Sequence, residues 1–272
     1  MGLGEDHVHQ HHMIRIRLLG EFEVHRSDGS RVEQREWRTG KTRDLVRLLA
    51  LADGHPVRVP ALIEKLWPDV SVSRARNSLG TAASQIRRTV GEPCVVRESD
   101  GLVLRNAWVD VSSFRALADR VQLAARSSAS AEVLTNARAA LTLYIGDFHA
   151  HEDDSAWAAG ERRMLQGLRI ATLCDAALAA IDLGLLREAL DLAATAVRLD
   201  PTVEAAHRSL MRAHAELGEI GMALRAFEEC RLHLADELGT DPSPQTQELH
   251  MQILRRPSEF RASPLTALRD SG

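Results

Sequence analysis

The sequence predicts an α+β N-terminal winged helix followed by an all-α domain of tetratricopeptide-like helical repeats. Two observations support this fold class. The first part of the chain contains, in order, alternating β-rich runs, three helical segments and a hairpin signal, which is the order of elements in a winged helix. The later residues are rich in Ala, Leu, Glu and Arg with helical periodicity, and short motifs recur there at a fixed interval.

Length and charge distribution fit two domains with different partners. The 272 residues are 44% apolar, which is enough for two hydrophobic cores. Residues 13–107 carry 17 Arg and Lys against 12 Asp and Glu, a net charge of +5, whereas the whole chain has a net charge of −4. The first domain therefore suits a polyanion, and the acidic remainder suits a protein with basic patches.

The chain divides into four predicted segments. Residues 1–12 are polar and lack periodicity, so we expect a disordered leader. Residues 13–107 form the predicted winged helix, and residues 108–256 form the helical domain. Residues 257–272 are expected to be a flexible tail.

Composition also limits the location and the chemistry of the protein. The uninterrupted apolar runs are shorter than a membrane span, and the N-terminal residues lack the apolar segment of a secretory signal. Cys94, Cys174 and Cys230 are far apart and do not form a CxxC pair, so neither a disulfide framework nor a zinc site is expected. The sequence therefore predicts a soluble cytoplasmic protein without membrane association.

The elements of the first domain follow from local patterns. The run IRIRLLGEFEVHR alternates from Ile14, and a turn at Ser27-Asp28-Gly29 leads to SRVEQ, which predicts a small antiparallel sheet. Helices are expected at 41–52, from Pro60 to Trp67, and at 74–90. The runs CVVRES and LVLRN then form a hairpin joined at Asp100-Gly101. The leading sheet makes this order similar to the OmpR-type winged helix.

The second domain reads as a series of helices with an internal repeat. The pair Leu183-Gly184 recurs 34 residues later as Leu217-Gly218, and this interval is the repeat length of tetratricopeptide helix pairs. Two clear units are fewer than a stable solenoid needs, so the preceding helices are expected to cap the array. The predicted helices lie near 111–127, 130–145, 154–183, 185–199, 202–217, 219–237 and 243–255.

The predicted helix RARNSLGTAASQIRRTV, residues 74–90, has two distinct faces. Its apolar stripe predicts a buried side and consists of Ala75, Leu79, Ala82, Ala83, Ile86 and Val90. Its other side carries cations, amides and small hydroxyls, flanked by Ser78 and Gln85, and no acid occurs anywhere in the helix. A helix that enters a DNA groove must bury one side and present small hydrogen-bonding groups on the other, and this segment meets both conditions.

The chain from Met13 to about Leu254 resembles the Streptomyces antibiotic regulatory protein family. The resemblance rests on LLGEFEV at 18–24, LIEKLWPD at 62–69, VDVSSF at 109–114, ALTLYIGDF at 140–148 and, most specifically, ELGTDPSPQT within residues 200–254. It implies an OmpR-type winged helix joined to a bacterial transcriptional activator domain. It also implies an activator that binds direct repeats in double-stranded DNA as a head-to-tail dimer, recruits RNA polymerase holoenzyme and controls secondary-metabolite genes.

The match to OmpR-type helices also implies which residues contact DNA. Base contacts are expected from Asn77, Ser78, Thr81 and Gln85, and phosphate contacts from Arg38, Lys41, Arg43, Arg74, Ser84, Arg88, Arg97 and Ser99. The hairpin departs from the family pattern, since Leu102 and Val103 stand where Tyr and Arg are usual. Glu98 and Asp100 would also be repelled by phosphates, so entry of this hairpin into the minor groove is not expected.

Other motifs carry no predicted chemistry. GKT at residues 40–42 lacks the glycine of a P-loop, because position 35 is Arg35. HAHEDD at 149–154 mimics a metal-binding turn but stands between helices. No nucleophile has a convincing base partner, so no enzyme activity, catalytic residue, cofactor or metal is expected. One alternative stays open, a helical-repeat adaptor or signal sensor whose winged helix is weak or degenerate.

Overall fold

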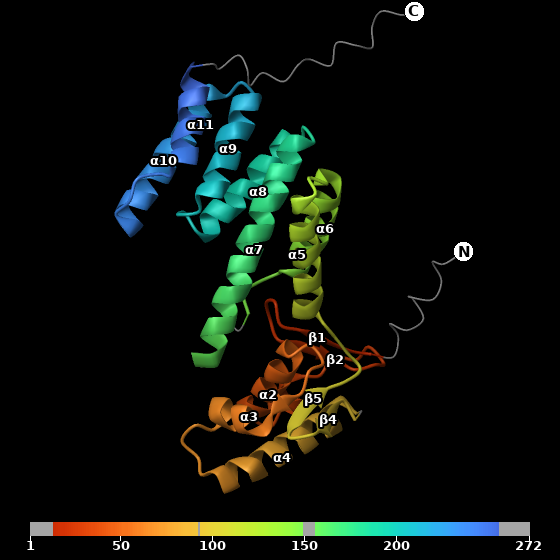
Figure 1. Ribbon diagram of the computed structural model, residues 1–272. Coiled ribbons are helices and arrows are strands. Elements are labelled where there is room, and N and C mark those ends of the chain that lie inside the picture. The colour runs from red at the N-terminus through yellow and green to blue at the C-terminus, as the bar shows by residue number, and fades with distance from the viewer. Residues whose placement is uncertain (1–12, 92, 149–155, 256–272) are drawn as a thin grey trace, which may run out of the picture. The chain divides into compact units, whose positions relative to one another are not determined.

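The computed structural model describes residues 13–91, 93–148 and 156–255 (Figure 1). The predicted leader, the predicted tail and the HAHEDD motif lie outside these residues. The chain forms two compact units that are not contiguous in sequence. Unit 1 comprises Met1–Ala116 and Leu143–Leu165, and unit 2 comprises Leu117–Thr142 and Gln166–Gly272.

The first sheet of unit 1 joins both ends of its N-terminal region. Strand β1 (Ile14–Arg17) pairs antiparallel with β2 (Glu23–His25) and parallel with β6 (Ala107–Val109). The antiparallel pair was expected from the alternating run. The SRVEQ segment contributes only a bridge from Arg31 to His25, and β6 takes the third place in the sheet instead.

The second sheet and three helices complete the N-terminal part of unit 1. The expected helices are present as α2 (Gly40–Leu51), α3 (Val59–Leu66) and α4 (Val72–Val90), after a short 3₁₀ turn, η2 (Gln34–Glu36). The sheet has the order β3-β5-β4, with bounds Val57–Arg58, Gly101–Leu104 and Val95–Glu98. All its neighbouring strands are antiparallel. Strand β3 was not expected, because two residues leave no readable alternation.

The hairpin turn differs by one residue from the prediction. Ser99 and Asp100 form the turn, with Ser99 at a φ of +51°, and Gly101 already belongs to β5. Gly101 is required for another reason. A Cβ at this position would stand 2.7 Å from the carbonyl oxygen of Val57, so a side chain would push β3 away from β5.

Two of the family motifs meet in unit 1. Gly20 of LLGEFEV has a φ of +118°, and a Cβ on Gly146 of ALTLYIGDF would stand 3.1 Å from its Cα. Leu19 and Phe148 form an antiparallel bridge beside this contact. The two glycines therefore allow backbones from distant parts of the sequence to approach closely.

A third motif residue, Asp110 of VDVSSF, is buried at the start of α5 (Asp110–Arg126). Its carboxylate accepts backbone N–H bonds from Leu18 at 2.9 Å, Leu19 at 3.0 Å and Val111 at 2.8 Å. Burial raises the pKa of Asp110, and these hydrogen bonds act in the opposite direction. Asp110 thus connects the end of β1 to the start of α5.

Unit 2 consists of helices in the expected order. After α5 come α6 (Ser130–Leu143), α7 (Ala156–Asp182), α8 (Leu186–Leu199), α9 (Glu204–Glu216), α10 (Ile220–Leu238) and α11 (Pro244–Arg255). Helix α9 packs against both α8 and α10, and α11 packs against α9 and α10. The repeated glycines Gly184 and Gly218 both have positive φ, at +72° and +79°, and each ends a helix before the next begins. These are stacked helix pairs of the tetratricopeptide type.

Small residues allow the helices of unit 2 to pack closely. The equivalent repeat positions Ala189 and Ala223 are fully buried. Cys94, Cys174 and Cys230 are free thiols. Within the described residues, one segment, Trp157–Asp182 of α7, is long and apolar enough to cross a membrane, although the uninterrupted apolar runs are short. Core helices of globular proteins meet the same criterion, and 44% of this apolar window is buried.

Candidate nucleic-acid interface

Helix α4 is fixed in unit 1 by its apolar side and by its C-terminal end. The predicted apolar stripe is buried throughout. The helix ends at Gly91, which has a φ of +82° and donates its N–H to the Arg87 carbonyl. The Arg26 Nε donates to the Thr89 carbonyl at 2.9 Å, and the Arg87 Nε donates to the Val95 carbonyl at 2.7 Å. The last turn of α4 is thus attached through arginine side chains to β4 and to the residue that follows β2.

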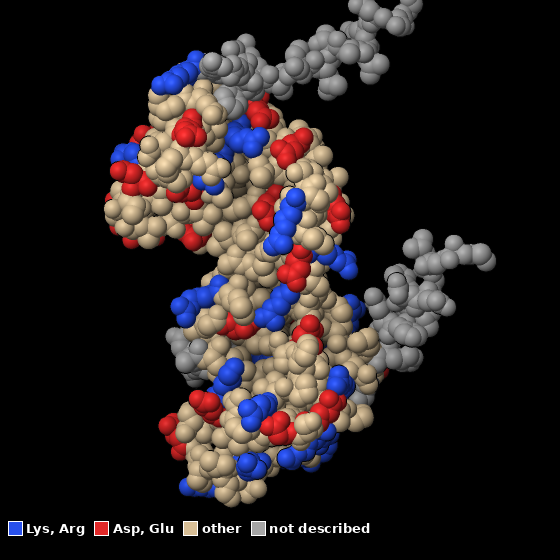
Figure 2. Space-filling model, in the orientation of Figure 1, with Lys and Arg blue, Asp and Glu red and all other residues tan. Residues whose placement is uncertain are grey.

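The opposite face of α4 is exposed and free of acids. Arg74, Asn77, Thr81, Ser84 and Arg88 are all exposed, and Ser78 is half-buried beside them. The Thr81 hydroxyl donates to the Asn77 carbonyl at 3.0 Å, which leaves its methyl group and its lone pairs available. In the view of Figure 2, blue Lys and Arg side chains gather over the region of α4. This face offers cations at its ends and small polar groups between them.

Gln85 points inward instead of lying with the exposed residues of α4. It is 6% exposed, and its Oε1 accepts a hydrogen bond from the Thr42 hydroxyl at 3.1 Å. Its Nε2 is buried without a hydrogen-bond partner among the described residues. This placement differs from the expected base-contact position. Gln85 directly precedes the buried Ile86 in α4. Its hydrogen-bond partner is the Thr42 hydroxyl on α2, and the periodicity of α4 alone does not reveal a partner on another helix.

A hollow of about 350 Å³ separates the N-terminus of α2 from α4. The lining residues from α2 include Lys41 and Thr42, and those from α4 include Asn77, Thr81 and Gln85. Gln85 therefore lines an opening that it shares with the three other predicted base-contact residues, Asn77, Ser78 and Thr81.

The predicted phosphate contacts on α2 and its N-cap do not all lie together. Thr39 caps α2 by accepting the Thr42 N–H, which confirms GKT as a helix start. Arg38 and Lys41 are exposed on either side of this cap. Arg43 is half-buried and lines a different hollow, beside Phe22 and Trp37.

Arginine side chains pair with both acidic residues of the hairpin, Glu98 and Asp100. Arg105 binds Glu98 through two nitrogens, with the shortest contact at 2.7 Å. Arg58 of β3 donates to Asp100 at 2.9 Å, and this hydrogen bond lowers the pKa of the exposed Asp100 carboxyl. The tip residues Arg97 and Ser99 are exposed. Since both acids have a cationic partner, the repulsion that the sequence predicts at this hairpin is reduced.

Three exposed arginines around this surface were not among the predicted contacts: Arg58, Arg76 and Arg105. Arg76 is exposed on α4 and lies between Arg74 and Asn77 in the sequence. Its positive charge was the sequence feature that could have identified it as a contact. Arg58 belongs to β3, which only the pairing with β5 reveals.

The helices of unit 2 match a known domain family. The stacked helices belong to a bacterial transcriptional activator domain, whose family model matches residues 109–254. The matched residues make up more than half of the chain. The chain belongs to the Streptomyces antibiotic regulatory protein family.

The relatives are regulatory proteins. AfsR of Streptomyces coelicolor is 29% identical over 81% of this chain, but the match covers 23% of AfsR, so this chain spans under a quarter of that relative. DnrI of Streptomyces peucetius is 28% identical, with 89% of this chain and 92% of DnrI covered. RedD of Streptomyces coelicolor is 25% identical, with coverage of 89% and 70%.

A solved structure supports the architecture. Mycobacterium tuberculosis EmbR, determined in complex with a low-affinity phosphopeptide, matches with a TM-score of 0.78 and 25% identity. The similarity covers 90% of this chain and 65% of EmbR. The N-terminal sheet region and the helical repeats thus occur together in another protein.

Proposed function

We propose that residues 13–107 form an OmpR-type winged helix that binds double-stranded DNA with α4 in the major groove. The observation that carries this proposal is the exposed, acid-free face of α4 opposite a fully buried apolar stripe. Such a face meets phosphates with its cations and base edges with its small polar groups.

In this arrangement, direct base contacts come from Asn77, Ser78 and Thr81. Gln85 joins them if its hydrogen bond to Thr42 is exchanged for one to a base; otherwise it sets the position of α2 relative to α4. Phosphate contacts come from the predicted residues Arg38, Lys41, Arg74, Ser84, Arg88, Arg97 and Ser99, whereas Arg43 lines a different hollow and is left out of this set. Arg76 is added to that set because it is exposed on the same helix.

At the level of the cell, we propose that the protein activates secondary-metabolite genes from the cytoplasm. Membership of the family supports binding to direct repeats by a head-to-tail dimer and recruitment of RNA polymerase holoenzyme. Reconstituted transcription from a promoter with a bound repeat tests recruitment. More transcript is expected with the protein than without it, and an equal amount would contradict activation.

The test of DNA binding begins with selection of bound duplexes from a random pool. Enrichment of a direct repeat is expected. The selected duplex and a scrambled one are then titrated with variants. Asn77→Ala is expected to reduce discrimination between the duplexes by about 1–3 kcal/mol. Arg88→Ala is expected to weaken both equally and to lower the salt slope by about one.

The matched control is Arg15→Gln, which removes an exposed cation that stacks on Trp108 and is not among the proposed DNA contacts. Its affinity and salt slope are expected to equal those of the unchanged protein. If Asn77→Ala, Arg88→Ala and Arg15→Gln all have the same effect, α4 is not the reading helix. Binding that is insensitive to salt would instead favour the adaptor function, since phosphate contacts make affinity fall steeply with salt.

A further inference from the structure

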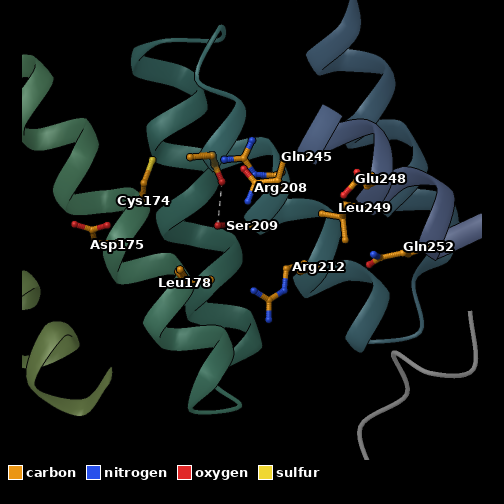
Figure 3. A pocket seen from close by; sticks show the side chains of 11 residues that line it. Cys174, Asp175, Leu178, Arg208, Ser209, Arg212, Gln245, Glu248, Leu249 and Gln252 are labelled. Carbon is orange, nitrogen blue, oxygen red and sulfur yellow. Dashed lines mark hydrogen bonds between the residues drawn. The ribbon is translucent and has the colours of Figure 1, made fainter. Parts of the chain in front are cut away.

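A cavity of about 570 Å³ lies within unit 2, between three helices of the repeat array (Figure 3). Its volume is in the range of roughly 300–1,000 Å³ that is typical of small-molecule sites. Figure 3 shows α7, α9 and α11 each presenting side chains around it. The charged and amide side chains that line it are Asp175 from α7, Arg208 and Arg212 from α9, and Gln245, Glu248 and Gln252 from α11.

A hydrogen-bond network holds α11 against α9 and so defines one wall of this cavity. The Glu204 carboxylate accepts hydrogen bonds from the Ser243 backbone N–H at 2.9 Å, the Ser243 hydroxyl at 2.7 Å and the Thr246 hydroxyl. Arg208 also donates to the Thr246 hydroxyl at 2.9 Å. Burial raises the pKa of Glu204, but these hydrogen bonds outweigh it and leave the pKa below its ordinary value. The ELGTDPSPQT motif therefore supplies the contacts that position α11.

Two half-buried side chains of opposite charge in the cavity form no hydrogen bond among the described residues, although Glu216, four residues further along α9, acts on Arg212 as a nearby charge. Within the described part of the chain, neither the Asp175 carboxylate nor the Arg212 guanidinium forms a hydrogen bond or an ion pair within 4.0 Å. Both side chains are half-buried. Desolvation raises the pKa of Asp175. A partly desolvated charge without a hydrogen-bond partner reduces stability, so a ligand that pairs with both groups would supply hydrogen bonds that these groups do not form within the protein.

The cysteine in the cavity does not supply reactive chemistry. Burial raises the pKa of the Cys174 thiol to about 11, which keeps it protonated at neutral pH. No group of three or more metal-ligating side chains occurs in the described ranges. The chemistry of the cavity is therefore that of ionic and hydrogen-bonding recognition.

We propose that this cavity binds a small zwitterionic ligand of the amino-acid or short-peptide type, with its ammonium group at Asp175 and its carboxylate at Arg212. The amides of Gln245 and Gln252 are available to its remaining polar groups, and Leu178 and Leu249 provide apolar contact. The site is independent of DNA binding by unit 1, so either proposal stands without the other.

The experiment uses the full chain and the standard L-amino acids, together with their dipeptides with alanine, as probes. Each is tested up to about 10 mM by thermal unfolding and calorimetry, because a ligand that binds only the folded state raises the melting temperature. At least one probe is expected to bind. The absence of binding by every probe would overturn the proposal.

The bound probe is then compared with its N-acetylated and its C-amidated forms. In the unchanged protein, each modification is expected to reduce affinity about tenfold or more, because it leaves one protein charge unpaired. In Asp175→Asn, N-acetylation is expected to have little further effect. In Arg212→Gln, the same is expected of amidation. This crossed pattern assigns each ligand charge to one residue.

Asp191→Asn on α8 and Arg225→Gln on α10 are the matched controls, since both residues are exposed and neither lines the cavity. They are expected to bind the probe and its modified forms as the unchanged protein does. Equal effects of N-acetylation in the unchanged protein and in Asp175→Asn would overturn the assignment. Binding of peptides with both ends blocked, without binding of free amino acids, would show a peptide groove instead.

Discussion

The exposed face of α4 and the cavity of unit 2 both present arginines, but in opposite settings. On α4, Arg74 and Arg88 are exposed, and water solvates them at little energetic cost. In the cavity, Arg212 and Asp175 are half-buried, and neither has an ion-pair partner among the described residues. An exposed row of cations suits an extended polyanion, whereas two partly desolvated opposite charges suit a small ligand with both signs.

A second contrast concerns two carboxylates whose pKa burial raises, Asp110 in unit 1 and Asp175 in unit 2. Asp110 is 2% exposed and accepts backbone hydrogen bonds from three residues, whereas Asp175 accepts none in the described structure. Desolvation raises the pKa of both. Substitution should therefore lower the stability at Asp110 and raise it at Asp175, because only the Asp110 carboxylate forms hydrogen bonds that stabilise the fold.

The largest effect is expected for Asp110→Ala. It leaves the N–H groups of Leu18, Leu19 and Val111 buried without an acceptor, so unit 1 should lose about 3 kcal/mol or more of its unfolding free energy. Denaturant unfolding followed by circular dichroism measures the loss. Asp119→Ala, at an exposed position of α5, is the control and should change stability by less than about 0.5 kcal/mol. A loss equal to that of the control would contradict a structural role for Asp110.

An intermediate effect is expected for Gly101→Ala in the hairpin that flanks α4. The added methyl group would meet the Val57 carbonyl oxygen at 2.7 Å, so β3 must shift, at a cost of about 2 kcal/mol. Hydrogen exchange of the Val57 and Leu102 amides should increase. Gly80→Ala is the control, because nothing lies within 4 Å of a Cβ there and alanine favours the helix. Equal protection in both variants would show that β3 tolerates the side chain.

The smallest effect, and one of opposite sign, is expected for Asp175→Asn in the absence of ligand. Because the folded-state pKa of Asp175 is raised, its ionised form destabilises the fold, and the variant should be more stable at neutral pH. The gain should shrink as pH falls through the raised pKa and vanish below the unfolded value of 3.8. Unfolding at several pH values, with Asp191→Asn as reference, measures this. The charged groups that share the cavity are Arg208, Arg212 and Glu248. A loss of stability at neutral pH would show that Asp175 has a partner.

Helical periodicity predicted the helices to within a few residues. The buried stripe of α4 is visible in the sequence because every third or fourth residue of a helix lies on the same face. The Leu-Gly repeat of unit 2 is visible because the same pair recurs along the chain. The short strands were not predictable in this way. Strands β3 and β6 have two and three residues, and each exists because it pairs with a segment far away in sequence.

The candidate DNA-binding surface was predicted in its main part but not in its details. The exposed positions of α4 follow from the same periodicity as the buried ones. The inward position of Gln85 depends on Thr42, and the pairing of Asp100 with Arg58 depends on β3. The cavity of unit 2 had no signal in sequence, since its lining comes from three helices that meet only in the folded chain.

The helices, their buried faces, the family and the cationic character of α4 could all be predicted from the sequence, because these properties depend on residue type and on spacing along one element. Three other properties became visible only in the folded chain: which glycines allow two backbones to approach closely, which acidic side chains pair with a cation, and which charged side chains do not form an ion pair. These properties depend on distances between segments that are remote in sequence, and a local pattern contains no information about such distances.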